Sequence, residues 1–110
     1  MPALIVSGRS FHYTDSGAPV GTSAAPVIAL HSGGLSSRQW SKLAALLAPR
    51  RRVLAPDFTG SGASAPWPEG EPYHYSVEVD LTRALLDTVG EPVHLVGHSF
   101  GGLVDRKAHV

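Results

Sequence analysis

The hydrophobic positions of the chain fall into short runs that alternate with amphipathic segments. Residues 26–30, 52–56 and 93–96 are mostly apolar runs, with the length expected of strands buried on both faces of a sheet. Between them, residues 36–49 and 76–90 carry apolar side chains at helical spacing. Strands that alternate with helices in this way predict an α/β fold, in which three parallel strands are joined by right-handed crossover helices.

The ends of these segments carry recognisable turn and cap residues. Residues 3–6 and 11–14 favour β-structure around Gly8 and precede a turn at residues 15–17, which predicts an N-terminal hairpin followed by a loop over residues 18–25. Ser36 stands three residues before Gln39, the spacing of a capping box. Ser76 is expected to cap the second helix, which Gly90 ends. A last helix is expected from residues 97–102 to residue 110.

Composition narrows the class of protein. A chain of 110 residues with 43% hydrophobic and 16% charged residues predicts one small globular domain. Nine basic and nine acidic residues balance, and apart from residues 50–52 they are scattered, so we expect no nucleic-acid or membrane partner. The chain has no cysteine, and its histidines show no metal-ligand spacing, so neither metal nor cofactor is expected. No membrane span or signal segment is recognisable, which makes a cytoplasmic location the expectation.

Ser99 is the centre of a G-x-S-x-G motif that directly follows the third apolar run. Other Gly-x-Ser tripeptides occur, such as those that begin at Gly8, Gly21 and Gly62, but none both follows a buried strand and ends in a second glycine. A serine on a tight strand-to-helix turn stands clear of the backbone, and the start of the helix directs free N–H groups toward developing negative charge. The alternative is that the glycines only permit a tight turn, as in a nucleotide-binding fold.

Four segments in order make the chain similar to the α/β-hydrolase superfamily from about residue 11 to residue 104. They are the loop His31-Ser32-Gly33-Gly34, the segment Asp57-Phe58-Thr59-Gly60-Ser61-Gly62-Ala63-Ser64, the helix 76–90, and Gly97-His98-Ser99-Phe100-Gly101-Gly102.

The resemblance implies roles for individual residues. Ser99 would be the nucleophile, the N–H groups of Gly33 and Phe100 would form the oxyanion hole, and Gly97, His98, Gly101 and Gly102 would shape the nucleophile elbow. Ser32 departs from the glycine usual at its position. The similar epoxide hydrolases and haloalkane dehalogenases have aspartate where this chain has Ser99, so the resemblance favours acyl-enzyme hydrolysis of an ester, a lactone or a related C–C bond. Asp57 would be structural.

The resemblance also places the acid and the histidine of the triad after the nucleophile, where only Asp105 and His109 are candidates. Both would lie on the helix that starts at Ser99, and neither is expected to reach the serine. The other histidines are expected to be surface or packed residues. We therefore expect residues 1–110 to form a single incomplete α/β-hydrolase domain that is inactive by itself, while the intact enzyme acts on a small acyl substrate.

Two further expectations follow from an incomplete fold. The strand over residues 93–96 would lack a neighbour on one side, so we expect self-association through its unpaired edge. The charges of residues 105–107 would be exposed, or would belong to a segment that does not continue the family's own sequence. Two functions from other classes stay open: a non-catalytic fragment or interaction module that docks through the sheet edge, and nucleotide binding. The second is disfavoured because residues 60–62 lack a third glycine and the chain has no P-loop.

Overall fold

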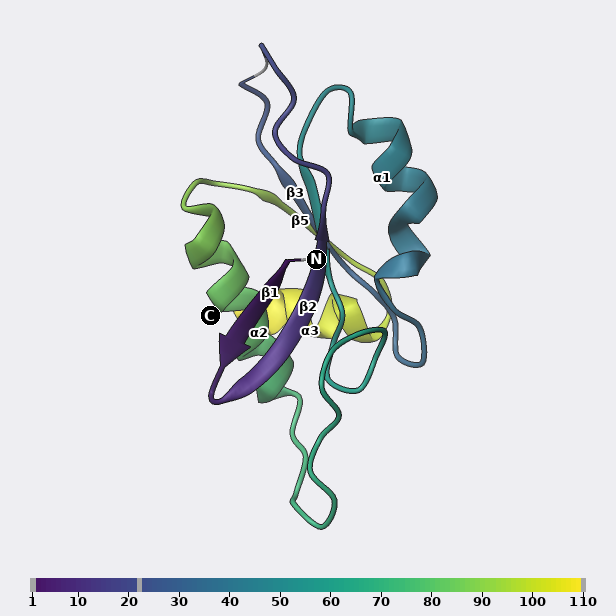
Figure 1. Cartoon of the computed structure of the whole chain (residues 1–110), viewed down its shortest axis with the longest axis vertical. Helices are drawn as coiled ribbons and strands as arrows, with labels where there is room; N and C mark the ends of the chain where they lie inside the picture. Colours follow the sequence, from purple (N-terminus) through teal and green to yellow (C-terminus); the bar gives the residue numbers. More distant parts are fainter. Residues whose placement is uncertain (1, 22, 110) are drawn as a thin grey trace.

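The fold is a mixed β-sheet with helices on both faces, seen in a computed structural model that describes residues 2–21 and 23–109 (Figure 1). The sheet has the order β1-β2-β4-β3-β5. Its strands are β1 (Ala3–Val6), β2 (Arg9–Asp15), β3 (Val27–Leu30), β4 (Val53–Pro56) and β5 (His94–Gly97). Strands β3, β4 and β5 are parallel, which confirms the predicted parallel core.

The predicted N-terminal hairpin is present, and it extends the sheet. Strands β1 and β2 are antiparallel, and their connection turns at Ser7 and Gly8, which have φ angles of 51° and 77°. The other edge of β2 pairs antiparallel with β4, from Tyr13 opposite Pro56 to Asp15 opposite Leu54. Because the hydrophobic pattern of a strand does not reveal its partner, the sequence did not indicate this second pairing.

The core lies where the two central parallel strands meet the helices. Every residue of β3 and β4 is buried, as their continuous apolar runs predict. Strand β5 differs: His94 is exposed and the rest of the strand is half-buried. The expectation that the third run is also buried on both faces is therefore wrong for this chain, because β5 pairs with β3 on one side and ends the sheet on the other.

The helices lie on opposite faces of the sheet. A short 3₁₀ helix, η1 (Ser37–Trp40), leads into α1 (Ser41–Leu47) on one face, and α2 (Ser76–Val89) covers the other (Figure 1). Helix α3 (Phe100–Ala108) packs against α2, β3 and β5. Its buried residues are Gly101 and Val104, whereas Arg106 and Lys107 are exposed. The predicted helix end at residue 110 and one residue of the predicted loop over 18–25 lie outside the described residues.

The caps differ from the sequence-based predictions in two places. The Ser36 hydroxyl accepts the N–H of Arg38, but the Gln39 side chain does not return to Ser36 as a capping box requires. Ser76 is the first residue of α2 and not its cap, and its N–H donates to Nδ1 of His74 over 3.1 Å. The end of α2 is as predicted, since Gly90 has a φ of 72° and its N–H donates to the carbonyl of Leu86.

Candidate active site

The chain turns sharply from strand to helix at Ser99. Strand β5 ends at Gly97, α3 begins at Phe100, and Ser99 between them has φ 55° and ψ −111°. A positive φ is unfavourable for a residue with a side chain, and such backbone strain is concentrated at functional sites. The surroundings hold the strain in place, because the N–H of His98 donates to the carbonyl of Leu30 and that of Leu103 to the carbonyl of Ser99.

Two glycines make this turn sterically possible. A Cβ on Gly101 would lie closer than 3.0 Å to the carbonyl of Leu30, and a Cβ on Gly97 would lie equally close to the carbonyl of Gly101. Real Cβ atoms essentially never come so near, so β3, β5 and α3 can meet here only if both residues lack side chains. Gly102 is different, since its Cβ would make only ordinary contact with Gly97.

The serine hydroxyl is next to two backbone amides that have no partner. Ser99 and Gly33 are exposed, and a Cβ on Gly33 would lie 3.8 Å from the Cβ of Phe100, so the loop after β3 and the start of α3 are neighbours. Within the described residues, no hydrogen bond involves the Ser99 hydroxyl or the N–H groups of Gly33 and Phe100. An exposed hydroxyl beside two free donors can bind a substrate carbonyl.

His31 supports the loop that carries Gly33. It is buried, its Nδ1 lies 2.7 Å from the carbonyl of Ser32, and its Nε2 lies 3.0 Å from the N–H of Phe58. Because the N–H of Phe58 can only donate, Nε2 accepts and the ring proton is on Nδ1. The ring packs on Phe58, whose ring in turn meets Phe100 edge to face. Both nitrogens of His31 are thus occupied in holding the loop.

Gln39 links the two sides of Ser99, a role that the sequence did not indicate. Its Oε1 accepts the N–H of Ser32 over 2.8 Å, and its Nε2 lies 2.9 Å from Nδ1 of His98. One side chain therefore joins the loop that carries Gly33 to the residue before the serine. Its helical position suggested a cap, and no local signal shows a contact across 59 residues.

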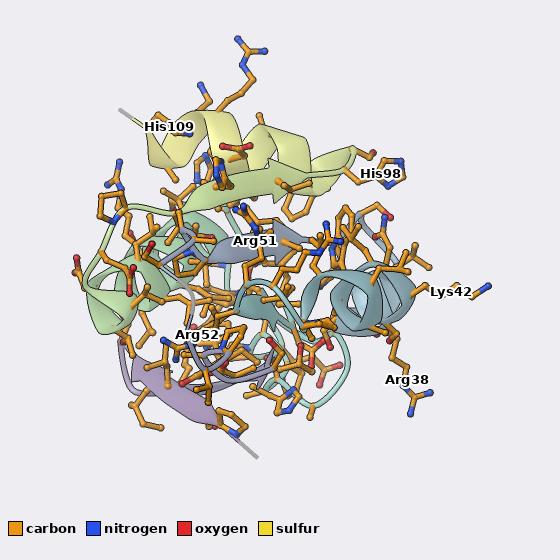
Figure 2. The ribbon with its side chains drawn as sticks, turned by 90° about the horizontal axis from the view of Figure 1, so that it is seen from above. Arg38, Lys42, Arg51, Arg52, His98 and His109 are labelled. Carbon is orange, nitrogen blue, oxygen red and sulfur yellow. The ribbon has the colours of Figure 1, made fainter. Side chains whose placement is uncertain are left out.

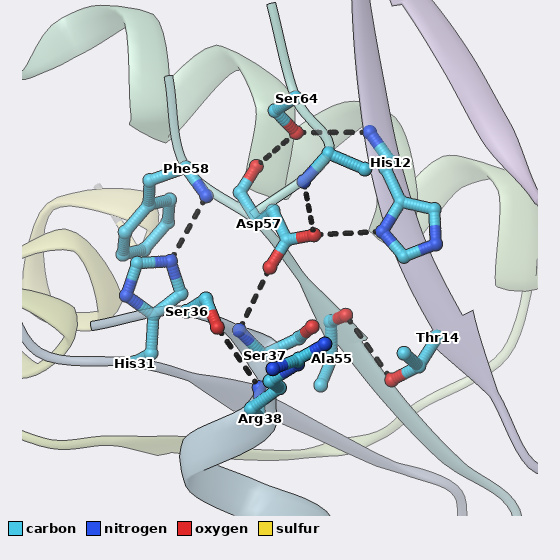
Figure 3. A network of polar contacts seen from close by, with 11 residues as sticks. His12, Thr14, His31, Ser36, Ser37, Arg38, Ala55, Asp57, Phe58 and Ser64 are labelled. Carbon is cyan, nitrogen blue, oxygen red and sulfur yellow. Dashed lines mark hydrogen bonds and ion pairs between the residues drawn. The ribbon is translucent and has the colours of Figure 1, made fainter. Parts of the chain in front are cut away.

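Asp57 anchors the loop after β4 (Figure 3). Oδ1 of this buried carboxylate accepts the N–H of Ser37 over 2.7 Å, and Oδ2 accepts from Nδ1 of His12 over 2.7 Å and from the N–H of Ala63 over 3.2 Å. Burial by itself raises the pKa of Asp57, but these hydrogen bonds outweigh it and hold the pKa below its ordinary value. The carboxylate is fully engaged in this network, and His12 is paired with it.

The remaining imidazoles lie away from Ser99. His94 is at the start of β5, about 10 Å along the strand from Gly97. His109 pairs with Asp105 over 2.9 Å at the far end of α3, about 13 Å along the helix axis from its start. Figure 2 shows His98 and His109 at opposite ends of helix α3. The structure therefore brings Ser99, Gly33 and Phe100 together and leaves Asp105 and His109 apart from them.

No cluster of three or more potential metal ligands is present among the described residues. In the same part of the chain, none of the helices has the length and apolar character needed to cross a membrane.

The chain is similar in sequence to known hydrolases. The sequence profile of the alpha/beta hydrolase family matches residues 27–107. The chain is 42% identical over 81 residues to the lipase LipV of Mycobacterium tuberculosis, a match that covers 73% of this chain and 30% of the lipase. It is 35% identical over 103 residues to 2-hydroxymuconate semialdehyde hydrolase of Pseudomonas sp. (strain CF600), covering 90% of this chain and 34% of that protein. The chain thus spans about a third of the length of these curated relatives.

A solved structure shows the same arrangement. The crystal structure of an alpha/beta hydrolase fold protein from Burkholderia ambifaria matches with a TM-score of 0.84 and 26% identity, over 98% of this chain and 38% of that one. The predicted partial fold is therefore confirmed.

Proposed function

Because the chain belongs to the alpha/beta hydrolase family, we propose that Ser99 is the nucleophile of a hydrolase that cleaves a small ester or a related acyl substrate through an acyl-enzyme. The observation that carries the proposal is the conformation at Ser99. An exposed hydroxyl is held by strained backbone between β5 and α3, beside the unpartnered N–H groups of Gly33 and Phe100.

This arrangement suits a two-step acyl transfer. Oγ of Ser99 forms a bond to the carbonyl carbon, the π electrons move to the carbonyl oxygen, and the serine proton passes to a base. The N–H groups of Phe100 and Gly33 then donate to the oxyanion. When this intermediate collapses, the bond to the leaving group breaks and the leaving group takes the proton. Water repeats the same steps on the acyl-enzyme and releases the acid.

The named relatives support the substrate class. One is a lipase and the other is a semialdehyde hydrolase, and they match 73% and 90% of this chain. The shared chemical step in such enzymes is the attack of a nucleophile on an activated carbonyl carbon. A small-molecule acyl substrate is therefore our proposal.

We further propose that the 110-residue chain has little activity by itself, as an incomplete domain. Serine requires a base to remove its proton. Five of the six described imidazoles are engaged elsewhere: His12 with Asp57, His31 with Phe58, His74 with Ser76, His98 with Gln39, and His109 with Asp105. The sixth, His94, is at the far end of β5. None of these contacts leads to Ser99. A cytoplasmic location likewise stays a prediction.

A fluorophosphonate probe tests both proposals. We expect the chain alone to show no labelling above that of a Ser99→Ala variant. A fusion protein in which the chain replaces the matching part of LipV should label at Ser99 and hydrolyse p-nitrophenyl acetate, and Ser99→Ala should lower the rate at least about a thousandfold. Labelling of Ser99 in the chain alone would contradict the proposed inactivity. A folded fusion that keeps its activity after Ser99→Ala would rule out the serine nucleophile.

A second candidate function rests on the edge of β5. Among the residues that the structure describes, this strand pairs with β3 alone, so one side of a half-buried, largely apolar strand is open. A non-catalytic fragment or interaction module would use this edge to dock on another chain, and a second copy is the simplest partner. Recovery of esterase activity on mixing with a complementary C-terminal fragment would separate a docking role from non-specific association.

A further inference from the structure

The contacts of Gln39 determine the orientation of its amide. The N–H of Ser32, a buried residue, can only donate, so the Gln39 atom 2.8 Å from it must be the oxygen. The NH₂ group of Gln39 then faces Nδ1 of His98 at 2.9 Å. Because an amide NH₂ can only donate, Nδ1 of His98 must accept, and the ring proton of His98 must be on Nε2.

We propose that Gln39 is a positioning residue of the site, whose amide ties the loop carrying Gly33 to the elbow through the Nε2–H tautomer of His98. Ser32 directly precedes Gly33, and His98 directly precedes Ser99. The bridge therefore spans the residues next to one oxyanion donor and next to the nucleophile. That these neighbours are catalytic rests on the proposed function, whereas the bridge and the tautomer do not depend on it.

The hydrogen bond from Ser32 to Gln39 matters more than a usual surface hydrogen bond. Ser32 stands where the family resemblance leads one to expect glycine, and this residue is buried while Gly33 and Gly34 are exposed. Loss of the Gln39 oxygen would leave a buried donor without a partner, which costs more than loss of an exposed bond. The loop would then shift until the N–H of Ser32 could donate to water, and the amide of Gly33 would move with it.

Three variants separate the hydrogen bond of Gln39 to Ser32 from its hydrogen bond to His98. Gln39→Met keeps the length of the side chain and removes both contacts. Gln39→Glu keeps an acceptor for Ser32 but presents a second acceptor to His98, so Nδ1 of His98 must become protonated. Arg38→Gln is the matched control, because Arg38 is on the same 3₁₀ helix and its guanidinium makes no hydrogen bond or ion pair within the described residues.

Nuclear magnetic resonance of the ¹⁵N-labelled full chain measures the effect of each substitution on the two contacts of Gln39. In the unchanged chain, the ring ¹⁵N shifts of His98 should show a bare Nδ1 and a protonated Nε2. Gln39→Glu should protonate Nδ1 and leave the amide exchange of Ser32 within twofold. Gln39→Met should speed that exchange roughly fivefold, the loss of one hydrogen bond, and shift the amide signals of Gly33 and Phe100. Arg38→Gln should change none of these signals.

Two results would overturn the proposal. One is a protonated Nδ1 and bare Nε2 on His98 in the unchanged chain. The other is unaltered Ser32 exchange and unaltered Gly33 signals in Gln39→Met. If Gln39→Met does not fold, the tautomer of His98 in the unchanged chain and in Gln39→Glu still decides the matter. None of these readings requires enzymatic activity, so they stay separate from the labelling test of Ser99.

Discussion

Gly97 and Gly101 show how single residues determine the shape of the site. At both positions the space that a Cβ would need is taken by backbone, which cannot move aside as a flexible side chain can. Close packing of β3, β5 and α3 therefore depends on the absence of two methyl groups. The same packing holds Ser99 in its strained conformation.

We expect Gly101→Ala to destabilise the chain by about 3 kcal/mol or more, since the added methyl group must push α3 away from β3. Gly102→Ala is the matched control on the same helix. Its Cβ has ordinary contacts, and alanine favours helix, so its free energy of unfolding should rise or stay within about 1 kcal/mol. Urea unfolding followed by circular dichroism measures both. Equal effects of the two substitutions would contradict the close approach at Gly101.

Asp57 makes the stability of the folded chain depend on pH. Its pKa is lowered in the folded chain from the ordinary value of 3.8. A group with a lowered folded pKa contributes stability that is present above the unfolded value and is lost as pH falls through the folded value. The stabilisation from Asp57 should therefore be complete at neutral pH and fade below the ordinary value.

Asp57→Asn tests this dependence. At neutral pH the variant should be less stable by about 2 to 4 kcal/mol, because Ser37, His12 and Ala63 lose an ionised acceptor. The difference should shrink as the pH falls below the ordinary value of 3.8, where the native carboxylate takes up a proton. Asp80→Asn, at an exposed acid on α2, is the control and should have little effect. If the difference in the free energy of unfolding between Asp57→Asn and the unchanged chain stays constant across this pH range, the ionised network is contradicted.

At the scale of elements, β5 is a half-buried strand at one edge of the sheet. The N–H groups of His94 and His98 donate to the carbonyls of Pro26, just before β3, and of Leu30, so by alternation those of Val93, Leu95 and Gly97 point toward the open edge. The N–H of Val93 makes no hydrogen bond within residues 2–21 and 23–109. An open edge with free donors is a template for another strand.

We predict that the chain self-associates through β5 at micromolar concentration. Val93→Pro should shift it toward monomer, because proline removes an outward N–H at a position just before the strand, where it is tolerated. Ile5→Lys, on β1 at the opposite edge, is the control and should leave the association unchanged. Size-exclusion chromatography with light scattering gives the mass. A sharp monomer peak for the unchanged chain would refute the prediction.

On the scale of the whole molecule, the topology gathers the site at one end of the parallel strands. The loops after β3 and β4 and the start of α3 all follow the carboxyl ends of neighbouring strands, where open α/β sheets bind their ligands. The chain measures 48 × 26 × 25 Å, because residues 16–21 and the segment 66–74 extend from opposite ends (Figure 1).

The sequence by itself determined the local elements and the position of the elbow. Apolar runs, helical spacing and glycines act over a few residues, so β3, β4, α2, the hairpin turn and the strand-to-helix change at Ser99 could all be predicted. The family resemblance also singled out Gly33 as a neighbour of Phe100, and the two residues are close.

The tertiary structure decided which distant groups meet. The pairing of β2 with β4, the open edge of β5, the His12–Asp57 contact and the Gln39 bridge each join residues far apart in the chain. Hydrogen bonds between distant residues depend on register and crossover geometry, and neither leaves a periodic signal in the sequence. For that reason the sequence predicts only a local cap for Gln39, although its partners lie on two other segments.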